Sequence, residues 1–159
     1  MSNTRINVGE RYRDFSLEDT QGEMVSLSAF EGHKNIYLVF NRGFMWPYCR
    51  AHMAQLRRDF KEFSKRDTII IAVGPDRKGA FKLFWKQNDI PYIGLSDHDH
   101  KVARLYDQEV NLLKAGRIPA QIVIDKKGIV RYVHYSKSMA DIPPNEKIFE
   151  LLDEINKSD

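Results

Sequence analysis

The feature that most restricts the fold is a strand-length apolar run followed closely by a helix that carries the only cysteine. Residues 36–40 are rich in β-branched and aromatic side chains, as buried strands are. A short polar loop leads from this run to Pro47, a residue favoured at the first position of a helix. Beyond it, apolar side chains recur with the period of one helix face, at Cys49, Met53, Leu56, Phe60 and Phe63. The stretch therefore predicts a strand, a tight loop and a helix, with Cys49 in the first turn of that helix.

Two interpretations of Cys49 follow from this placement. A thiol in the first turn lies beside amide groups without a helical partner and beside the positive end of the helix dipole. Such a position can lower a thiol pKa from about 8.5 toward neutrality and populate the reactive thiolate. Cys49 also shares an apolar face with Met53 and Leu56, and free cysteine is often a small buried core residue. The residues by themselves leave both interpretations open.

The remainder of the chain alternates strand-like runs with helical patterns. A polar arm at residues 1–13 leads to a predicted N-terminal β-hairpin, and Asp125-Lys126-Lys127-Gly128 marks a second hairpin near the end. This order predicts one α/β domain over residues 1–159, with a central mixed β-sheet flanked by helices. The predicted strands are at 15–18, 24–27, 36–40, 68–73, 91–95, 122–124 and 129–135, and the predicted helices at 28–32, 47–63, 80–88, 102–106 and 148–155.

Composition argues against several classes of function. The formal net charge is only +3, with Lys and Arg scattered along the chain, which argues against a nucleic-acid partner. No apolar run approaches the length needed to span a bilayer, and the N-terminus has no apolar signal segment. A single cysteine cannot form an internal disulfide, which agrees with a reducing compartment and predicts a cytoplasmic protein. No glycine-rich phosphate-binding motif is present, so no nucleotide cofactor is expected.

The polar cluster Asp97-His98-Asp99-His100 brings two carboxylates and two imidazoles together. Adjacent ligands in one short turn cannot by themselves surround an ion, so no metal site is predicted there. Ser96 or Asp97 is instead expected to cap the helix that follows.

Four stretches of the chain resemble, in the right order, one family of redox proteins. They are 14–17 with 25–30, 40–43 through 46–50, 95–97 with 102–106, and 119–128. Together they are similar to the thioredoxin fold in its peroxiredoxin-like form, the alkyl hydroperoxide reductase/thiol-specific antioxidant superfamily. The resemblance covers nearly the whole chain. It implies a thioredoxin-like fold with an N-terminal β-hairpin.

At the active-site loop the resemblance allows two alignments. Against members that read F-x-R-G-x-x-C-P-Y-C, Trp46 stands in place of the first cysteine and Cys49 matches the second. Against the motif P-x-x-x-T-x-x-C, Cys49 matches the peroxidatic cysteine, while Trp46 replaces the threonine and Arg42 the proline. In this second alignment, Pro119 stands where an activating arginine is expected.

The resemblance implies an antioxidant oxidoreductase that reduces hydroperoxides through Cys49. A thioredoxin- or glutathione-like thiol would act as external reductant, no cofactor would be needed, and a homodimer would be compatible. Arg42 is the second expected catalytic residue, and the residues expected to shape the site are Trp46, Pro47, Arg50 and Pro119, the last with a cis peptide bond facing Cys49. The alternatives are a catalytically silent thioredoxin-fold binding protein and a dithiol-disulfide oxidoreductase inactivated at Trp46.

Overall fold

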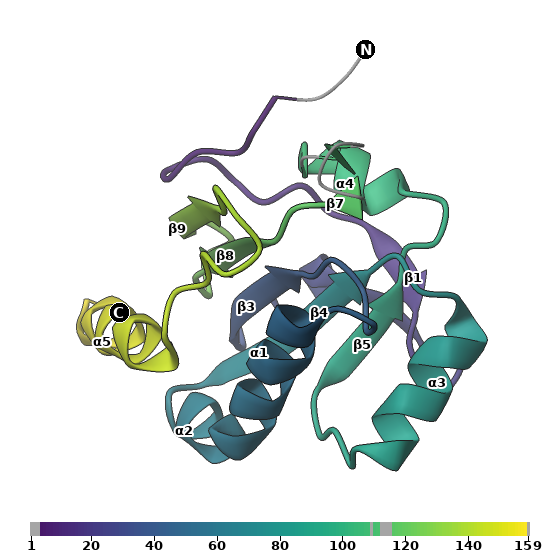
Figure 1. The fold of residues 1–159 in the computed structure, drawn as a ribbon. Coiled ribbons are helices and arrows are strands. Elements are labelled where there is room, and N and C mark those ends of the chain that lie inside the picture. Colours follow the sequence, from purple (N-terminus) through teal and green to yellow (C-terminus); the bar gives the residue numbers. More distant parts are fainter. Residues whose placement is uncertain (1–3, 109, 112–115, 159) are drawn as a thin grey trace.

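The fold is built on a five-stranded mixed sheet. The computed structural model describes residues 4–108, 110–111 and 116–158. The strand order is β5-β4-β3-β8-β9, in which β3, β4 and β5 are parallel and β8 runs antiparallel to both β3 and β9 (Figure 1). The predicted mixed sheet is therefore confirmed. The strands are β3 Asn35–Phe40, β4 Thr68–Gly74, β5 Ile93–Ser96, β8 Ala120–Ile124 and β9 Val130–Tyr135.

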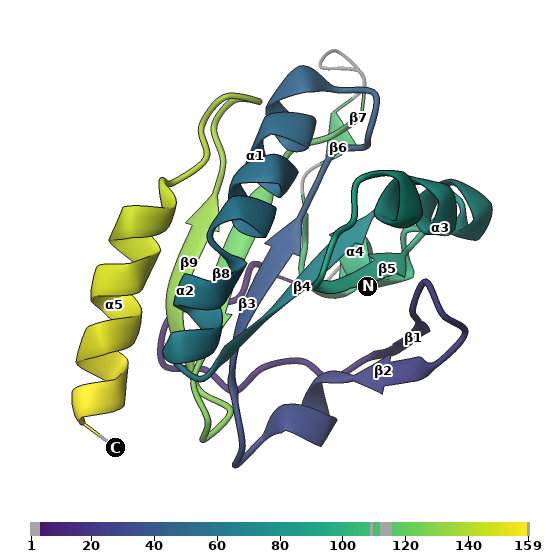
Figure 2. The ribbon, with the colours of Figure 1, turned by 90° about the horizontal axis from the view of Figure 1, so that it is seen from below.

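Helices cover one face of this sheet, and the N-terminal part of the chain covers the other. Figure 2 shows α1, α2 and α5 lying along the first face, with α3 beside them over β5. Alternate side chains of β3 point to this face. Two of them, Tyr37 and Val39, belong to the same buried cluster as Met53 of α1 and Ile148 of α5. The helices are α1 Pro47–Arg58, α2 Phe60–Lys65, α3 Lys78–Gln87, α4 Lys101–Leu105 and α5 Asn145–Lys157.

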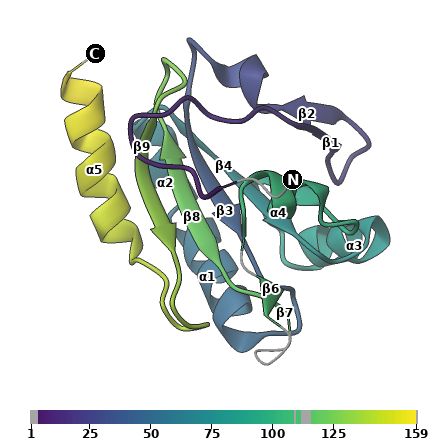
Figure 3. The ribbon, with the colours of Figure 1, turned by 90° about the horizontal axis from the view of Figure 1, so that it is seen from above.

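The opposite face carries the predicted N-terminal hairpin, formed by β1 Ser16–Glu18 and β2 Met24–Ser26 (Figure 3). A 3-10 turn at Leu27–Phe30 and helix α4 complete this layer. The segment before the hairpin packs against the second hairpin: Ile6 is buried, and the Gly9 amide donates to the Val130 carbonyl at 2.8 Å. Because both faces are covered, all six residues of β3 are buried.

The β8–β9 hairpin is confirmed at its predicted turn. The Asp125 carboxylate accepts the amides of Lys127 at 2.9 Å and Ile129 at 3.0 Å, and Gly128 has the positive φ that such a turn requires. Two further short strands, β6 Val110–Asn111 and β7 Gly116–Arg117, pair with each other and were not predicted.

The helix predicted over 47–63 is divided at Asp59 into α1 and α2. The Asp59 backbone leaves the helical region, with φ −99° and ψ 12°, and aspartate is a weak helix former. Its carboxylate accepts the Asn145 side-chain amide at 2.9 Å, which ties the break to the start of α5. The apolar face nevertheless continues across the break to Phe63, which is fully buried.

Asp97 performs the capping role that was predicted for Ser96 or Asp97. Helix α4 begins after His100, and the fully buried Asp97 carboxylate accepts the amides of Val102 at 3.0 Å and Ala103 at 2.9 Å. Side-chain acceptors for first-turn amides are what a helix N-terminus needs.

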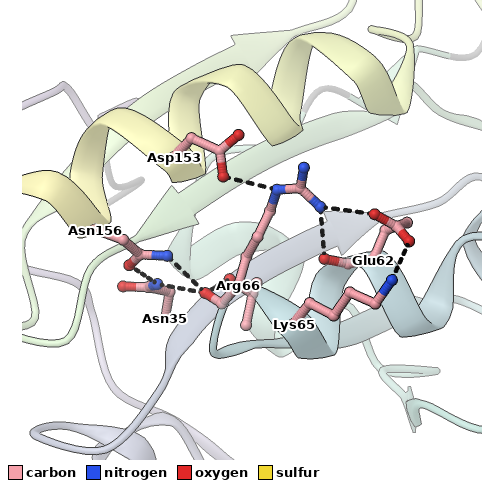
Figure 4. Close-up of polar contacts among 7 residues, drawn as sticks. Asn35, Glu62, Lys65, Arg66, Asp153 and Asn156 are labelled. Carbon is pink, nitrogen blue, oxygen red and sulfur yellow. Dashed lines mark hydrogen bonds and ion pairs between the residues drawn. The ribbon is translucent and has the colours of Figure 1, made fainter.

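A polar cluster attaches α5 to the sheet at the end of β3 that is remote from Cys49 (Figure 4). Arg66 donates to Asp153 of α5 at 2.9 Å and to Glu62 at 3.1 Å. Its carbonyl oxygen accepts the Asn156 side-chain amide at 2.9 Å, and Asn156 in turn accepts from Asn35 at the start of β3.

Among the described residues, no helix is long and apolar enough to cross a membrane.

Candidate active site

Cys49 lies where the sequence placed it, in the first turn of the helix that follows β3. Helix α1 begins at Pro47, and Trp46 is its N-cap residue, with extended φ −93° and ψ 127°. The loop between Phe40 and Trp46 returns over the helix start, so that the backbone amide of Arg42 donates to the Cys49 Sγ at 3.2 Å. The sulfur therefore sits against the backbone of the strand–helix loop, and Cys49 is only 3% exposed.

Burial, however, dominates the acidity of this thiol. Desolvation raises the pKa of Cys49 above its ordinary value, because a buried thiolate loses its hydration. The backbone amides of Arg42 and Gly43 and the Arg42 charge act in the opposite direction, but they do not outweigh burial. Of the two interpretations that the sequence left open, a lowered thiol pKa and a small buried core residue, burial in this structure favours the second.

Arg42 and Trp46 form a stacked pair beside the thiol. The Arg42 guanidinium carbon lies 3.4 Å from the centre of the Trp46 ring, and both side chains are half-buried. Gly43 lies between them with φ +138°, and a Cβ built there would be 3.5 Å from Trp46 Cδ1. A guanidinium against an aromatic face is a stabilising arrangement. The predicted site residues Arg42 and Trp46 thus come together, in contact with each other.

The carboxylate of Asp76 supports the same loop and was missed in the sequence. Asp76 follows β4, and its Oδ2 accepts the Phe44 amide at 3.1 Å. Its negative charge raises the pKa of Cys49. A signal was available: β3 and β4 are adjacent parallel strands, and residues just beyond the carboxyl ends of such strands meet at one edge of the sheet.

Replacing Asp76 by asparagine is expected to make Cys49 more acidic. Asparagine keeps an oxygen acceptor for the Phe44 amide but removes the negative charge, so the thiolate becomes less unfavourable. We expect the pKa of the Cys49 thiol to fall and the share of thiolate at neutral pH to rise. The measurement is the rate of iodoacetamide alkylation of Cys49 against pH, with Asp76→Ala as the variant that loses both charge and acceptor. If the midpoint of the alkylation rate against pH were the same in Asp76→Asn and in the natural protein, the charge of Asp76 would not act on the thiol.

His52 is a second residue that the sequence did not single out. It lies one turn beyond Cys49, is 4% exposed, and its Nε2 has no hydrogen-bond partner among the described residues. Burial lowers the pKa of His52 to about 4, so the ring is neutral at physiological pH. The ring borders a hollow of about 130 Å³ between α1 and the segment before α5, together with Tyr48, Gln55 and Ile142.

Of the other predicted residues, Pro119 is near the site and Arg50 points elsewhere. Pro119 is buried directly before β8, whose first residue, Ala120, pairs with Phe40 at the end of β3. The described residues contain no cis peptide bond, so the predicted cis bond at Pro119 is wrong. The chain enters β8 in the trans form that isolated X–Pro bonds favour by about 0.5–1 kcal/mol. Arg50 is exposed and borders a groove on the α3 side of α1.

The cluster at residues 97–100 does not assemble a metal site with other parts of the fold. Within the described ranges, no group of three or more His, Cys, Asp or Glu side chains could hold a metal ion. Asp97 is instead occupied by the amides of α4.

Comparison with known proteins assigns the chain to a family. Residues 8–133 match the model of the AhpC/TSA family, and the chain belongs to that family. The predicted peroxiredoxin-like membership of the thioredoxin-fold superfamily is confirmed.

Two curated relatives and one solved structure show the extent of the similarity. Peroxiredoxin Bcp of Bacillus subtilis is 32% identical over 102 residues, which are 64% of this chain and 64% of the relative. The chloroplastic peroxiredoxin Q of Triticum aestivum is 30% identical over 132 residues, 82% of this chain and 59% of the relative. The chain therefore spans about three fifths of the length of these curated relatives. The crystal structure of peroxidoxin BcpB from Mycobacterium tuberculosis superposes with a TM-score of 0.83 at 25% identity, covering 95% of this chain and 99% of that one.

Proposed function

We propose that this protein is a thiol peroxidase that reduces hydroperoxides through Cys49 and is returned to its thiol state by an external thiol. The observation that carries the proposal is the position of the chain's one cysteine. Its sulfur lies in the first turn of α1 and accepts the Arg42 amide from the strand–helix loop. Membership of the AhpC/TSA family supports the same chemistry.

The reaction divides into an oxidation and a reduction of Cys49. The thiolate attacks the terminal oxygen of the hydroperoxide, the O–O bond breaks, and the departing alkoxide takes a proton to become an alcohol. Cys49 is left as a sulfenic acid. One external thiol condenses with it, releasing water and forming a mixed disulfide. A second thiol then displaces Cys49, which regains its thiol while the reductant leaves as a disulfide.

The side chains around the sulfur have separate roles in this scheme. The Arg42 charge favours the thiolate, and its amide donates to the sulfur that becomes charged. Because Cys49 is 3% exposed, the residues around it must move before a peroxide can reach the sulfur. Pro47 and Pro119 shape the site by starting α1 and by leading into β8.

A catalytically silent binding protein is the second candidate, and the same burial favours it. A thiol with 3% exposure and a raised pKa resembles a core residue more than a nucleophile. The third candidate, a dithiol oxidoreductase inactivated at Trp46, draws on the fact that Trp46 occupies the N-cap of α1. The three candidates differ in whether Cys49 itself is oxidised by peroxide.

The setting of this activity is part of the proposal. We infer that residues 1–159 form one domain. We also infer a cytoplasmic location, because a lone cysteine suits a reducing compartment. The reductant would be thioredoxin- or glutathione-like, and a homodimer is compatible with the fold. Neither a nucleic acid nor a cofactor enters the scheme.

The test is single-turnover oxidation of the reduced protein by hydrogen peroxide and by cumene hydroperoxide, with dimedone trapping the sulfenic acid for mass spectrometry. We expect labelling at Cys49 at a rate that rises with pH, because burial holds the thiol protonated at neutral pH. With excess dithiothreitol in place of dimedone, peroxide should be consumed over many turnovers. A rate no faster than that of free cysteine at every pH would instead favour the binding protein.

A further inference from the structure

A groove between α1 and α3 combines two arginines with an apolar floor. We call it the α1–α3 groove and define it by Arg50, Met53, Ala54, Arg57, Phe84 and Ile90, with Asn88 at its end. Its volume is about 90 Å³. This is several times the roughly 10–15 Å³ that one water needs, and far below the several hundred Å³ of a pocket that encloses a large ligand. The groove therefore has room for a short apolar chain.

The charge of the groove is positive and is not balanced within it. Arg50 and Arg57 are seven residues apart on one helix, so their backbones are about 10.5 Å apart along its axis. Arg57 donates to the Asn88 carbonyl oxygen at 2.7 Å, a neutral acceptor that fixes the guanidinium without cancelling its charge. None of the described residues that border the groove carries a carboxylate. An anion placed between the two arginines would meet no carboxylate of the groove lining.

The floor of the groove is apolar and firmly held. Met53 is fully buried, and the Tyr92 hydroxyl donates to its carbonyl oxygen at 2.9 Å. The half-buried Phe84 ring stacks on Phe44 at a centroid distance of 4.3 Å and an interplanar angle of 9°. Phe44 belongs to the loop before Cys49, and its amide is bonded to Asp76. Phe84 therefore connects the groove to this loop through its stack with Phe44.

We propose that the α1–α3 groove binds a small organic anion, a carboxylate joined to an apolar chain of a few carbons. The chain lies on Met53, Ala54, Phe84 and Ile90, and the carboxylate lies between the guanidinium groups of Arg50 and Arg57. Guanidinium is the side-chain group best matched to a carboxylate, because its paired N–H donors fit the two oxygens. The site is separate from the thiol chemistry and does not depend on Cys49 being reactive.

The experiment is an NMR titration of the ¹⁵N-labelled protein with hexanoate, hexan-1-ol and acetate. Hexanol keeps the chain without the charge, and acetate keeps the charge without the chain. We expect hexanoate to shift the amides of Ala54, Phe84 and Phe44, and each of the other two probes to bind at least about threefold more weakly. Arg57→Gln and Arg50→Gln should each weaken hexanoate binding by roughly three- to tenfold.

Arg58→Gln is the matched control, since Arg58 is next to Arg57 on the same helix but is ion-paired with Asp59 at 2.9 Å. Hexanoate affinity in this variant should stay within about twofold of the unchanged protein, the scale of a surface charge at a distance. All three arginine variants replace exposed side chains, and unchanged resonances in the absence of probe would show that they remain folded. Equal binding of hexanoate and hexanol, shifts confined to other surfaces, or equal losses in Arg57→Gln and Arg58→Gln would overturn the proposal. So would binding of the acidic peptide N-acetyl-Glu-Leu-Glu-amide with no response to hexanoate, which would indicate a protein partner.

Discussion

Replacing Cys49 by serine is expected to reduce peroxide consumption to the rate of the reductant alone. The thiolate sulfur is the only cysteine nucleophile in the chain, and a serine hydroxyl does not attack the O–O bond. Serine is close to cysteine in size, and its oxygen can accept the Arg42 amide that now bonds to Sγ. The loss should therefore be chemical and leave the fold intact. The measurement is the decay of hydrogen peroxide in the presence of dithiothreitol, read with a ferrous iron indicator.

Two controls separate this loss from other effects. Thermal unfolding followed by circular dichroism should show that Cys49→Ser retains the native helix signal. Met24 is an exposed sulfur on β2, 66% accessible, so Met24→Leu tests whether methionine oxidation contributes. That variant should retain full turnover. If Cys49→Ser still consumed peroxide over many turnovers, the proposed thiol chemistry would be wrong.

The second large effect is a loss of stability on acidification that depends on His52. Burial holds the pKa of His52 at about 4 in the folded protein, against 6.5 for an accessible histidine. As the pH falls below 6.5, the unfolded chain binds a proton that the folded protein does not, so the free energy of unfolding decreases. The decrease ends near pH 4, where the folded form is protonated too. At about 1.36 kcal/mol per pKa unit the total loss is roughly 3 kcal/mol.

This window is favourable for measurement, because the carboxylates with lowered pKa values titrate mostly below it. Asp59 and Glu62 are held below their ordinary values by Arg58 and by Lys65, respectively, so their contribution to stability is lost only in stronger acid. Urea unfolding at pH 7.0, 5.5 and 4.5 should show a steep decline for the natural protein. His52→Phe, which cannot bind a proton, should flatten that decline, whereas His98→Gln, at an exposed position, should preserve it. If the free energy of unfolding declined equally with falling pH in His52→Phe and in the natural protein, His52 would not be the cause of the decline.

Local patterns predicted the elements that position the site. The apolar run at 36–40, Pro47 and the spacing of Cys49, Met53 and Leu56 are enough to specify a strand, a loop and the start of a helix. These features depend on side-chain periodicity and on the fixed φ of proline, which act within a few residues. The second hairpin was predictable for the same reason, since its turn is made by the Asp125 side chain and a glycine that follow one another in the chain.

The errors arose where the outcome depended on what packs against a residue. Asp59 lies inside the helix predicted over 47–63, yet Asn145, 86 residues later, bonds to it at the break between α1 and α2. Pro119 was expected to be cis by resemblance, but its bond is trans. Asp76 lies 32 residues from Phe44, whose amide it accepts. Sequence spacing holds no information on such pairs until the strand order is known.

The sequence by itself determined that one cysteine would stand at the start of a helix after a buried strand, because both elements are specified by residues next to one another. Only the tertiary structure decided how deeply that cysteine is buried and in which direction its pKa is shifted. Burial in the assembled core raises the thiol pKa, and the charge of Asp76, which follows β4, acts in the same direction. The amides of Arg42 and Gly43 act in the opposite direction but do not outweigh burial. Desolvation is set by everything that surrounds a group at once, so it cannot be read from the neighbours of that group along the chain.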